Sequence, residues 1–358
     1  MRLLWHAIDG LGLGHVVRLL AIAGRVGALR PGWQSLFLTN SDADSLIVGE
    51  GFPVFKVPSR TSFAAAGFTG GRQLRLVQSA TQAIVSTFDP HALITDTMPA
   101  GPYLELLPIL QWPVFKAFVY RERRDEAARA PDFQEILRAY HLLLVPHTRG
   151  SVELVVPPGP RVAWCGDVLL RTRREALGRR EARRHLGLPE VGAACLVSAG
   201  GAGGGPETGR AIASALEAAA SIPDLHVVYA RGPYAASGPV PDGVRTVQAF
   251  PLARYLPAFD VAIATAGYNT ATELAHFGIP SVLLPLPRGI DDQRRRARHL
   301  AGLGFMTDCD SADVAAITAA AARMLAMGPQ RAAVRGTGAL AAARALVRSL
   351  ETAVAPGP

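Results

Sequence analysis

Short apolar runs alternate with stretches of helical periodicity along the whole chain. In the first half, the apolar runs are RLLWHAI, QSLFLT, FPVFKVP, HALITD, WPVFKAFVY and HLLLVP. Runs of this length are typical of buried strands, and the spacing of apolar residues predicts helices over 15–28 and roughly 72–87. Because strands that alternate with helices form parallel sheets, we expect a sheet covered by helices on both faces.

The same alternation starts again after the segment RVAWCGDVL. Further strands are expected at AACLVSAGG, LHVVYA, VRTVQAF, VAIATAG and PSVLLPL, with helices between them and an Ala-rich helical segment over 311–353. The predicted fold class is α/β, with two Rossmann-like domains whose parallel sheets face each other across a cleft. We assign 1–165 to an N-terminal domain, 166–335 to a C-terminal domain and 336–358 to a C-terminal helix and tail.

Composition and charge narrow the classes of partner. The chain has 358 residues and a formal net charge of +8, which favours nucleic acid, a membrane surface or a phosphorylated small molecule. No aromatic-and-basic stacking motif or helix-turn-helix pattern is present, so we expect no nucleic acid. Cys165, Cys195 and Cys309 are too few and too far apart for a disulfide framework or a zinc site. With no signal peptide and no apolar run of about 18 residues, these features predict a cytoplasmic protein.

The loop after the first predicted strand has the spacing GLGLGHVVR, which places Gly12 and Gly14 directly before His15. Glycines let a ligand approach the backbone closely. The expected helix N-terminus lowers the pKa of the imidazole and favours the neutral form, which a general base needs. Arg18 lies one turn further along the same side of the helix, where it could hold an anionic group or orient the loop.

Acidic residues near this loop leave several interpretations open. As an alternative to catalysis, the loop is a dinucleotide-type turn with a structural histidine, for which Asp42 and Asp44 are loosely placed partners. Asp96 closes the strand HALITD, where it could orient His15, bind an acceptor hydroxyl or cap the following helix. Glu105, further along the same segment, is expected to face solvent or to form a salt bridge.

Two loops in the second half are candidates for phosphate binding. SAGGAGGGPETGR (198–210) follows a strand and precedes a helix, so its backbone N–H groups can bind phosphate oxygens, the alternative being a flexible turn. Gly267, Asn269 and Thr270 open a second helix and form a second diphosphate site. Glu273, in the first turn or so of that helix, can accept both hydroxyls of a ribose, or merely stabilise the helix dipole.

Other polar segments have weaker interpretations. Asp291, Asp292 and Gln293 open another helix, where their acceptor side chains suit sugar hydroxyls, although N-capping also explains either aspartate. The arginine runs at 171–184 and 294–298 are expected to be solvated helix faces. The triplet DCD at 308–310 looks like a metal motif, but we interpret it as loop and helix-capping residues and predict no metal site.

The segment 260–305 resembles the donor-binding half of GT-B glycosyltransferases. The shared pattern is a small-residue turn with Tyr-Asn-Thr (Gly267–Thr270), Glu273 in the helix, G-x-P before a strand (Gly278–Pro280) and D-Q at the next helix start (Asp292–Gln293). The pattern is most similar to the group that contains the lipid-II-forming N-acetylglucosaminyltransferase. GLGHVVR likewise resembles the N-terminal signature of the same superfamily.

The resemblance implies a bacterial, metal-independent hexosyltransferase that works without a cofactor. It would move a sugar, with inversion, from a UDP- or dTDP-linked donor on the C-terminal domain to an acceptor hydroxyl on the N-terminal domain. The acceptor would be a small molecule or a lipid-linked one, which would bring the protein into peripheral contact with the inner face of the membrane. The resemblance also implies a role for each candidate residue. Glu273 would bind the ribose, Phe250 would contact the nucleobase, and His15 would be the general base. Asp292 and Gln293 would contact the transferred sugar, and the diphosphate would be bound by Gly200, Gly201, Gly267, Asn269 and Thr270.

The GLGHVVR stretch also resembles the nucleotide-sugar hydrolase of pseudaminic acid synthesis, in which His15 would activate water. The long segment DTMPAGPYLELLPILQ and the size of the N-terminal domain favour transfer over hydrolysis. Arg18 stands where many plant-type relatives have proline, and the opening loop is longer than in the lipid-II enzyme. Both differences leave the identity of the acceptor open.

Overall fold

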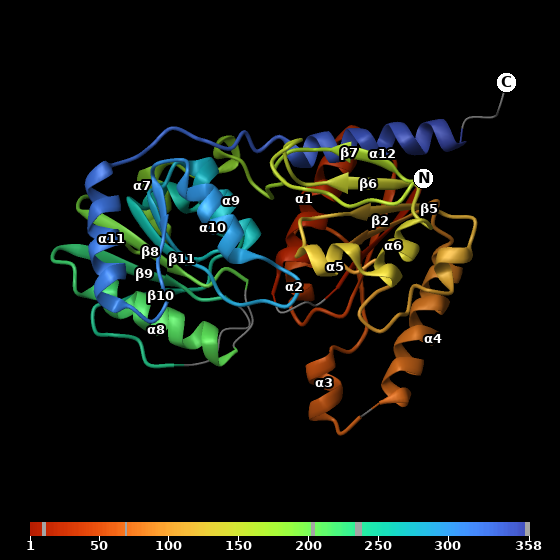
Figure 1. Cartoon of the computed structure of the whole chain (residues 1–358), viewed down its shortest axis with the longest axis horizontal. Helices are drawn as coiled ribbons and strands as arrows, with labels where there is room; N and C mark the ends of the chain where they lie inside the picture. Colours follow the sequence, from red (N-terminus) through yellow and green to blue (C-terminus); the bar gives the residue numbers. More distant parts are fainter. Residues whose placement is uncertain (9–11, 69, 202–204, 233–237, 355–358) are drawn as a thin grey trace. The chain divides into compact units, whose positions relative to one another are not determined.

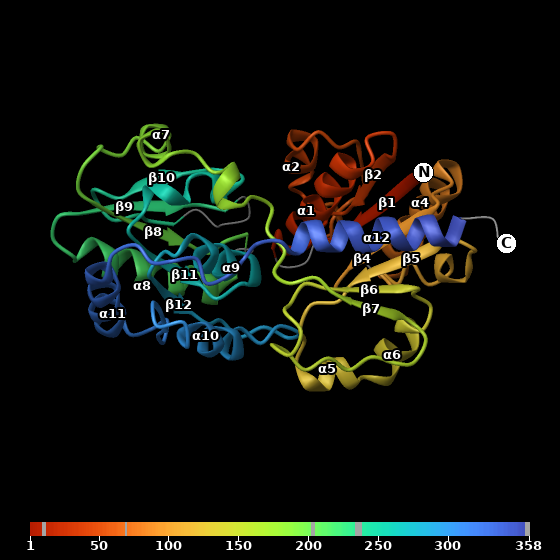
Figure 2. The same ribbon diagram turned by 90° about the horizontal axis from the view of Figure 1, so that it is seen from above.

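The computed structural model describes residues 1–8, 12–68, 70–201, 205–232 and 238–354. The chain divides into two compact units, one of Met1–Val168 with Thr337–Pro358 and the other of Leu169–Gly336. Each unit contains one sheet in which every strand pair is parallel, so the predicted α/β class is confirmed (Figures 1 and 2). The C-terminal segment, which we had set apart as 336–358, belongs to the first unit.

The sheet of the first unit has the strand order β3-β2-β1-β4-β5-β6-β7. Its strands are β1 (Arg2–Ala7), β2 (Gln34–Thr39), β3 (Val54–Lys56), β4 (Ala92–Asp96), β5 (Phe115–Val119), β6 (Leu142–Val145) and β7 (Arg161–Trp164). The helices of this unit are α1 (Gly14–Leu29), α2 (Asp44–Gly49), α3 (Arg60–Ala65), α4 (Gly71–Phe88), α5 (Asp125–Arg129), α6 (Pro131–Leu137) and α12 (Gly338–Val354), with a 3₁₀ turn η1 (Ile109–Gln111). The segment RVAWCGDVL supplies β7, which pairs with β6.

Helices cover both faces of this sheet, as a buried parallel sheet requires. Leu4 and Leu93 point to the face where residues of α3 and α4 pack, and Phe118 packs there against α6. On the opposite face α12 lies along α1 (Figure 2). Because Leu346 and Leu350 of α12 are completely buried, the end of the chain is part of the core of this unit.

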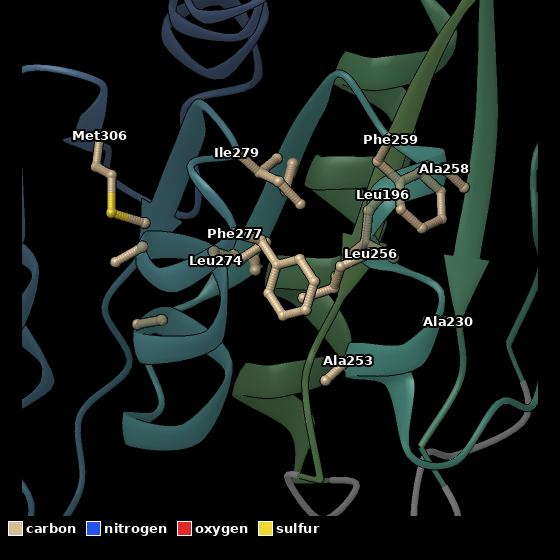
Figure 3. Close-up of a cluster of buried hydrophobic side chains, with 14 of the residues drawn as sticks. Leu196, Ala230, Ala253, Leu256, Ala258, Phe259, Leu274, Phe277, Ile279 and Met306 are labelled. Atoms are coloured by element: carbon tan, nitrogen blue, oxygen red, sulfur yellow. The ribbon is translucent and has the colours of Figure 1, made fainter. Parts of the chain in front are cut away.

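The sheet of the second unit has the order β10-β9-β8-β11-β12-β13. Its strands are β8 (Ala193–Ser198), β9 (Leu225–Ala230), β10 (Arg245–Val247), β11 (Val261–Thr265), β12 (Ser281–Leu284) and β13 (Met306–Asp308). Its helices are α7 (Arg179–His185), α8 (Pro206–Ala220), α9 (Tyr268–Phe277), α10 (Gln293–Ala301) and α11 (Val314–Met327), with 3₁₀ turns η2 (Arg173–Glu175), η3 (Leu252–Arg254) and η4 (Leu256–Ala258). One apolar cluster joins α7, α9 and α10 to the sheet, and part of it is drawn in Figure 3. A second cluster joins α8 and α11 to the other face.

Both strand orders reverse at one point, between β1 and β4 in the first sheet and between β8 and β11 in the second. At such a switch point the chain leaves neighbouring strands in opposite directions, and the loops beyond their carboxyl ends separate. These crevices are where open parallel sheets bind ligands. The fold therefore places the loops after β1 and β4, and those after β8 and β11, where ligand-binding residues are expected.

The helical parts differ from the sequence expectations in two respects. The segment 311–353 is two helices, α11 and α12, and they lie in different units. One arginine of each run is buried, Arg183 in 171–184 and Arg296 in 294–298. Neither run is therefore entirely a solvated face. The Arg183 guanidinium donates to the carbonyl oxygens of Ala258 (3.1 Å) and Gly192 (2.7 Å), which ties α7 to the sheet. Among the described helices, none is both long enough and apolar enough to cross a membrane.

Candidate active site

A histidine, a carboxylate and a guanidinium meet at the switch point of the first sheet. His15 lies in the first turn of α1, and Asp96 is the last residue of β4. His15 Nδ1 lies 2.8 Å from Asp96 Oδ1. Arg18, one turn further along α1, binds the same carboxylate through both oxygens, at 2.9 Å from Nε and 2.7 Å from Nη2. The geometry brings Asp96 to His15, the first of the three roles considered for this carboxylate.

The charges of this group determine which imidazole nitrogen carries the proton. Burial raises the pKa of Asp96, but the Arg18 charge and the hydrogen bonds from His15 and Arg18 outweigh it, so the pKa lies well below its usual range. Burial lowers the pKa of His15, and the charges of Arg18 and Arg121 lower it further. A neutral imidazole beside an ionised carboxylate donates Nδ1–H to it. His15 Nε2 is therefore left as the atom that accepts a proton.

Arg18 was expected to hold an anionic group or to orient the glycine loop. Its side chain is only 2% exposed, and it pairs with both Asp96 oxygens. The anionic group that it holds in this structure is therefore a carboxylate of the protein itself. A buried guanidinium paired in this bidentate way fixes the carboxylate that lies against His15.

Two arginines that sequence reasoning missed lie next to this group. Arg121 and Arg123 follow the carboxyl end of β5, and the Arg123 Nη1 donates to the carbonyl oxygen of Thr97 at 2.7 Å. Thr97 has a left-handed backbone (φ 61°), and its hydroxyl donates to Asp96 Oδ1 at 2.5 Å. The signal was present, because YRERR comes directly after a predicted strand, where polar side chains gather at the carboxyl edge.

The other acidic candidates of this unit have structural partners. Glu105 is buried, not solvent-exposed: its Oε1 lies 3.0 Å from His6 Nε2, so of the two expectations the salt bridge is the one observed. Lys56 Nζ lies 2.9 Å from Asp42 and 3.6 Å from Asp44. Neither aspartate is thus a free ribose acceptor.

The opening glycine loop is only partly within the described residues. Gly12 and Gly14 precede His15 and are half-buried, and α1 begins at Gly14 without a side-chain hydrogen bond at its N-cap. Gly10, like Asp9, lies outside the described residues. The N-terminus of α1 therefore presents backbone donors beside His15, at the place the sequence pattern predicts.

The two glycine turns of the second unit lie side by side at the switch point of its sheet. Gly200 has a left-handed backbone (φ 64°), and a Cβ added there would collide with the Thr270 hydroxyl. The Thr265 hydroxyl donates to the carbonyl oxygen of Ala199 at 3.0 Å, which ties the end of β11 to the turn after β8. Gly201 is half-buried beside Gly200, and the turn continues into residues outside the described ranges. A glycine is required at position 200 because there is no room for a side chain between the two turns.

Helices α8 and α9 both start at this edge without a side-chain cap. Their N-caps are Gly205 and Gly267, and neither cap makes a side-chain hydrogen bond. Asn269 and Thr270 lie in the first turn of α9. The positive end of a helix dipole at such a terminus favours an anion. Two such ends beside Gly200 can bind the two phosphates of one diphosphate.

Glu273 has an environment unlike that of an ordinary helix glutamate. It lies in the second turn of α9, is half-buried, and has no hydrogen bond or ion pair to any of the described residues. Burial raises its pKa from 4.5 to about 7. Glu273 lies beyond the first turn of α9, where a contact with the helix dipole is strongest. A desolvated carboxylate with unused acceptors is suited to hydroxyl donors such as those of a ribose.

This pKa shift has a consequence for stability. Because the folded-state pKa of Glu273 lies above its unfolded value, its contribution is fully present below about pH 4.5 and is lost as the pH rises through about 7. We expect the free energy of unfolding of the ligand-free protein, measured in urea, to fall over this pH range. In Glu273→Gln this fall should be absent. Glu217→Gln, on the exposed face of α8, is the matched control. A Glu273→Gln variant with the wild-type pH slope would show that this carboxyl titrates normally.

The residues expected to contact the transferred sugar already have protein partners. Asp292 caps α10 by accepting from the Arg295 N–H at 2.9 Å, and the Gln293 Oε1 accepts from the Leu286 N–H at 3.1 Å. Asp291 pairs with Arg296. The N-capping interpretation thus holds for Asp292, and what remains for a sugar is its second oxygen and the amide N–H₂ of Gln293.

Two candidates from the sequence remain, Phe250 and the DCD triplet. Phe250 is half-buried between β10 and η3. In the DCD triplet, Asp308 ends β13 and Asp310 accepts from the Ala312 N–H at 3.0 Å, while Asp313 caps α11. Among the described residues, no group of three or more His, Cys, Asp and Glu side chains is placed to hold a metal ion.

Two comparisons show which known proteins the sequence is similar to. Residues 216–346 match the family model of the erythromycin biosynthesis protein CIII-like C-terminal domain. The UDP-N-acetylglucosamine–N-acetylmuramyl-(pentapeptide) pyrophosphoryl-undecaprenol N-acetylglucosamine transferase of a Nocardioides species is 33% identical over 175 residues, which cover 44% of this chain and 47% of that protein. The chain thus matches about half the length of this curated relative.

Two solved structures extend the comparison to the whole chain. The spinosyn rhamnosyltransferase SpnG has a TM-score of 0.59 and 20% identity, covering 98% of this chain and 100% of that chain. SpnG complexed with thymidine diphosphate has a TM-score of 0.56 and 19% identity, covering 99% and 96%. At this identity the likeness shows the fold, which is GT-B. The sequence matches add a similarity to the family model over 216–346 and to the lipid-II-forming enzyme over 175 residues, the group that the motifs resemble.

Proposed function

We propose that this protein is an inverting glycosyltransferase that moves a sugar from a nucleoside-diphosphate sugar to an acceptor hydroxyl. One observation carries the proposal: His15 Nδ1 lies 2.8 Å from Asp96, a carboxylate that Arg18 holds ionised. This arrangement orients a neutral imidazole with Nε2 as a general base. The first unit supplies the base, and the second unit binds the donor.

In the proposed reaction, His15 Nε2 takes the proton of the acceptor hydroxyl as its oxygen forms a bond to the anomeric carbon. The bond between that carbon and the diphosphate oxygen breaks, and the diphosphate leaves with the electron pair. Asp96 remains ionised and stabilises the imidazolium. The uncapped N-termini of α8 and α9 stabilise the charge that grows on the leaving group. We expect no metal ion to be needed, because helix N-termini can supply this stabilisation.

The donor is proposed to be a UDP- or dTDP-linked sugar. The curated relative is named for a UDP-linked sugar, and SpnG has been solved with thymidine diphosphate. Glu273 supports a nucleoside rather than a bare diphosphate, since its unused acceptors suit ribose hydroxyls. The relatives differ in acceptor, because the curated relative's name includes pyrophosphoryl-undecaprenol and SpnG has been solved with spinosyn aglycone. We leave the acceptor as a hydroxyl compound, lipid-linked or not, and propose a cytoplasmic site of action.

Incubation with donor alone and with donor plus a panel of hydroxyl acceptors separates transfer from hydrolysis. A transferase releases nucleoside diphosphate much faster when an acceptor is present and forms a glycosylated product, which NMR shows with the anomeric configuration inverted. Rapid, stoichiometric release of free sugar from donor alone, unchanged by acceptors, would establish the hydrolase alternative instead. Products with a retained configuration would contradict the role of His15 as the base in a single displacement.

A further inference from the structure

A pocket in the second unit lies at the sheet edge opposite the glycine turns. Its volume is about 340 Å³, within the range of small-molecule sites. Asp260 directly precedes β11 and Pro280 directly precedes β12, so the pocket opens at the amino ends of these strands. Gly200 and Gly267 instead follow the carboxyl ends of β8 and β11. The pocket is therefore separate from the proposed donor site.

The walls of the pocket are mostly apolar. Leu256 comes from η4 and Phe277 from the last turn of α9, and the two side chains approach each other in Figure 3. Phe259 and Ile279 follow these elements in the chain and are also labelled there. The rings of three prolines complete the lining: Pro257, Pro280 and Pro329. Such a surface can take an aromatic or branched aliphatic group and bury it from water.

Backbone geometry maintains one wall. Gly278 ends α9 in the left-handed region (φ 68°), and a Cβ there would collide with the carbonyl oxygen of Gln330. The Gln330 N–H donates to the Gly278 carbonyl oxygen at 2.9 Å. The segment that carries Pro329 is thereby fastened to the end of α9, so the wall is a fixed part of the fold.

Two guanidinium groups line the pocket, and only one is neutralised. The Arg179 Nη2 donates to both Asp260 oxygens, at 2.8 and 2.9 Å. Asp260 also accepts from Arg183 (3.2 Å) and from the Ala194 N–H (2.9 Å), so little of its acceptor capacity is left. Arg173 is anchored through its backbone N–H to His276 Nε2 at 3.1 Å, but its guanidinium has no hydrogen bond or ion pair to any described residue. Arg173 is solvent-exposed, so its positive charge faces the pocket and solvent without a carboxylate partner among the described residues.

We propose that this pocket binds a small amphipathic carboxylate. The apolar walls take the hydrocarbon body, and Arg173 pairs with the carboxylate, for which a guanidinium offers two parallel donors. A neutral compound leaves the charge uncompensated. A diphosphate has two anionic groups, but the lining offers one unpaired cation. The second phosphate would therefore have no cationic partner.

Isothermal titration calorimetry of the full chain with 4-phenylbutyrate and with neutral 4-phenylbutanol tests this assignment. The acid is expected to bind about tenfold more tightly than the alcohol. Arg173→Gln should lower the affinity for the acid to that for the alcohol, whereas Arg174→Gln, an exposed neighbour in η2 outside the lining, should change neither. Pro329→Trp, at an exposed position of the wall, should fill the pocket and weaken both probes.

Several results would overturn the proposal. They are the absence of binding heat for the acid at millimolar concentration, equal affinities for acid and alcohol, or an equal loss in the Arg173→Gln and Arg174→Gln variants. Titration of the same variants with UDP shows whether the donor site is intact. Since the two sites lie at opposite edges of the sheet, UDP affinity should not follow the change in acid affinity.

Discussion

His15→Ala should lower kcat by about 10²-fold or more while leaving the affinity for the nucleoside diphosphate nearly unchanged. The general base contributes typically ~10²–10⁴-fold to rate. The proposed donor-binding residues lie in the second unit, whereas His15 belongs to the first, so we expect removal of the imidazole to leave the donor contacts in place. Steady-state kinetics give kcat, and calorimetry with UDP gives the affinity.

His299→Ala is the matched control, because this histidine is exposed in the last turn of α10 and contacts no candidate residue. It should retain wild-type kcat. The pH dependence adds a second check: with its pKa lowered by burial, His15 should keep kcat/KM high below the usual histidine pKa of 6.5. An unaffected rate in His15→Ala would remove this residue from the mechanism.

Asp96→Asn should lower kcat by about 10²-fold or more and also destabilise the protein. The amide can donate to His15 Nδ1, which favours the tautomer that has its proton on Nε2, where it cannot act as a base. The substitution also leaves the buried Arg18 charge without its carboxylate, and breaking a buried pair in this way costs about 3–5 kcal/mol. Turnover and the free energy of unfolding in urea measure the two effects separately.

The double variant Asp96→Asn/Arg18→Met separates positioning from stability. Removing both partners eliminates the unpaired charge, so much of the stability should return while turnover stays low. Full recovery of turnover in the double variant would show that Asp96 only neutralises Arg18.

The stability that Asp96 contributes depends on pH. Because its pKa is lowered in the folded protein, this contribution is present above about pH 4 and is lost as the pH falls. Asp96→Asn should lack this acid-dependent decline.

The alternation of apolar runs predicted the strands well, because a strand buried on both faces is a nearly continuous apolar run. It did not show which sheet a strand near the border between the units joins. RVAWCGDVL looks like any other strand, and only its pairing with β6 assigns it to the first sheet. Likewise, the Ala-rich segment 311–353 has helical spacing throughout, but whether one helix or two form depends on packing partners far away in the chain.

The candidate site shows the same division between local and distant information. Local spacing placed His15 correctly at a helix start and Gly200 in the turn after a strand, since these patterns depend on neighbouring residues. It could not show that Arg18 is occupied by Asp96, nor that Glu105 pairs with His6, because these contacts join residues separated by about 80 to 100 positions. The arginine runs failed for the same reason, since a single inward-facing member such as Arg296 depends on a distant carbonyl, that of Ala266.

The central claim is that the paired turns after β8 and β11 bind a nucleoside diphosphate, with Glu273 on its ribose. Calorimetric titration of wild type and Glu273→Ala with UDP and dTDP tests it most directly. We predict saturable binding by wild type and a loss of about tenfold or more in the variant, the scale of a charge-assisted hydrogen bond. No binding by wild type, or equal affinities in the two proteins, would contradict it.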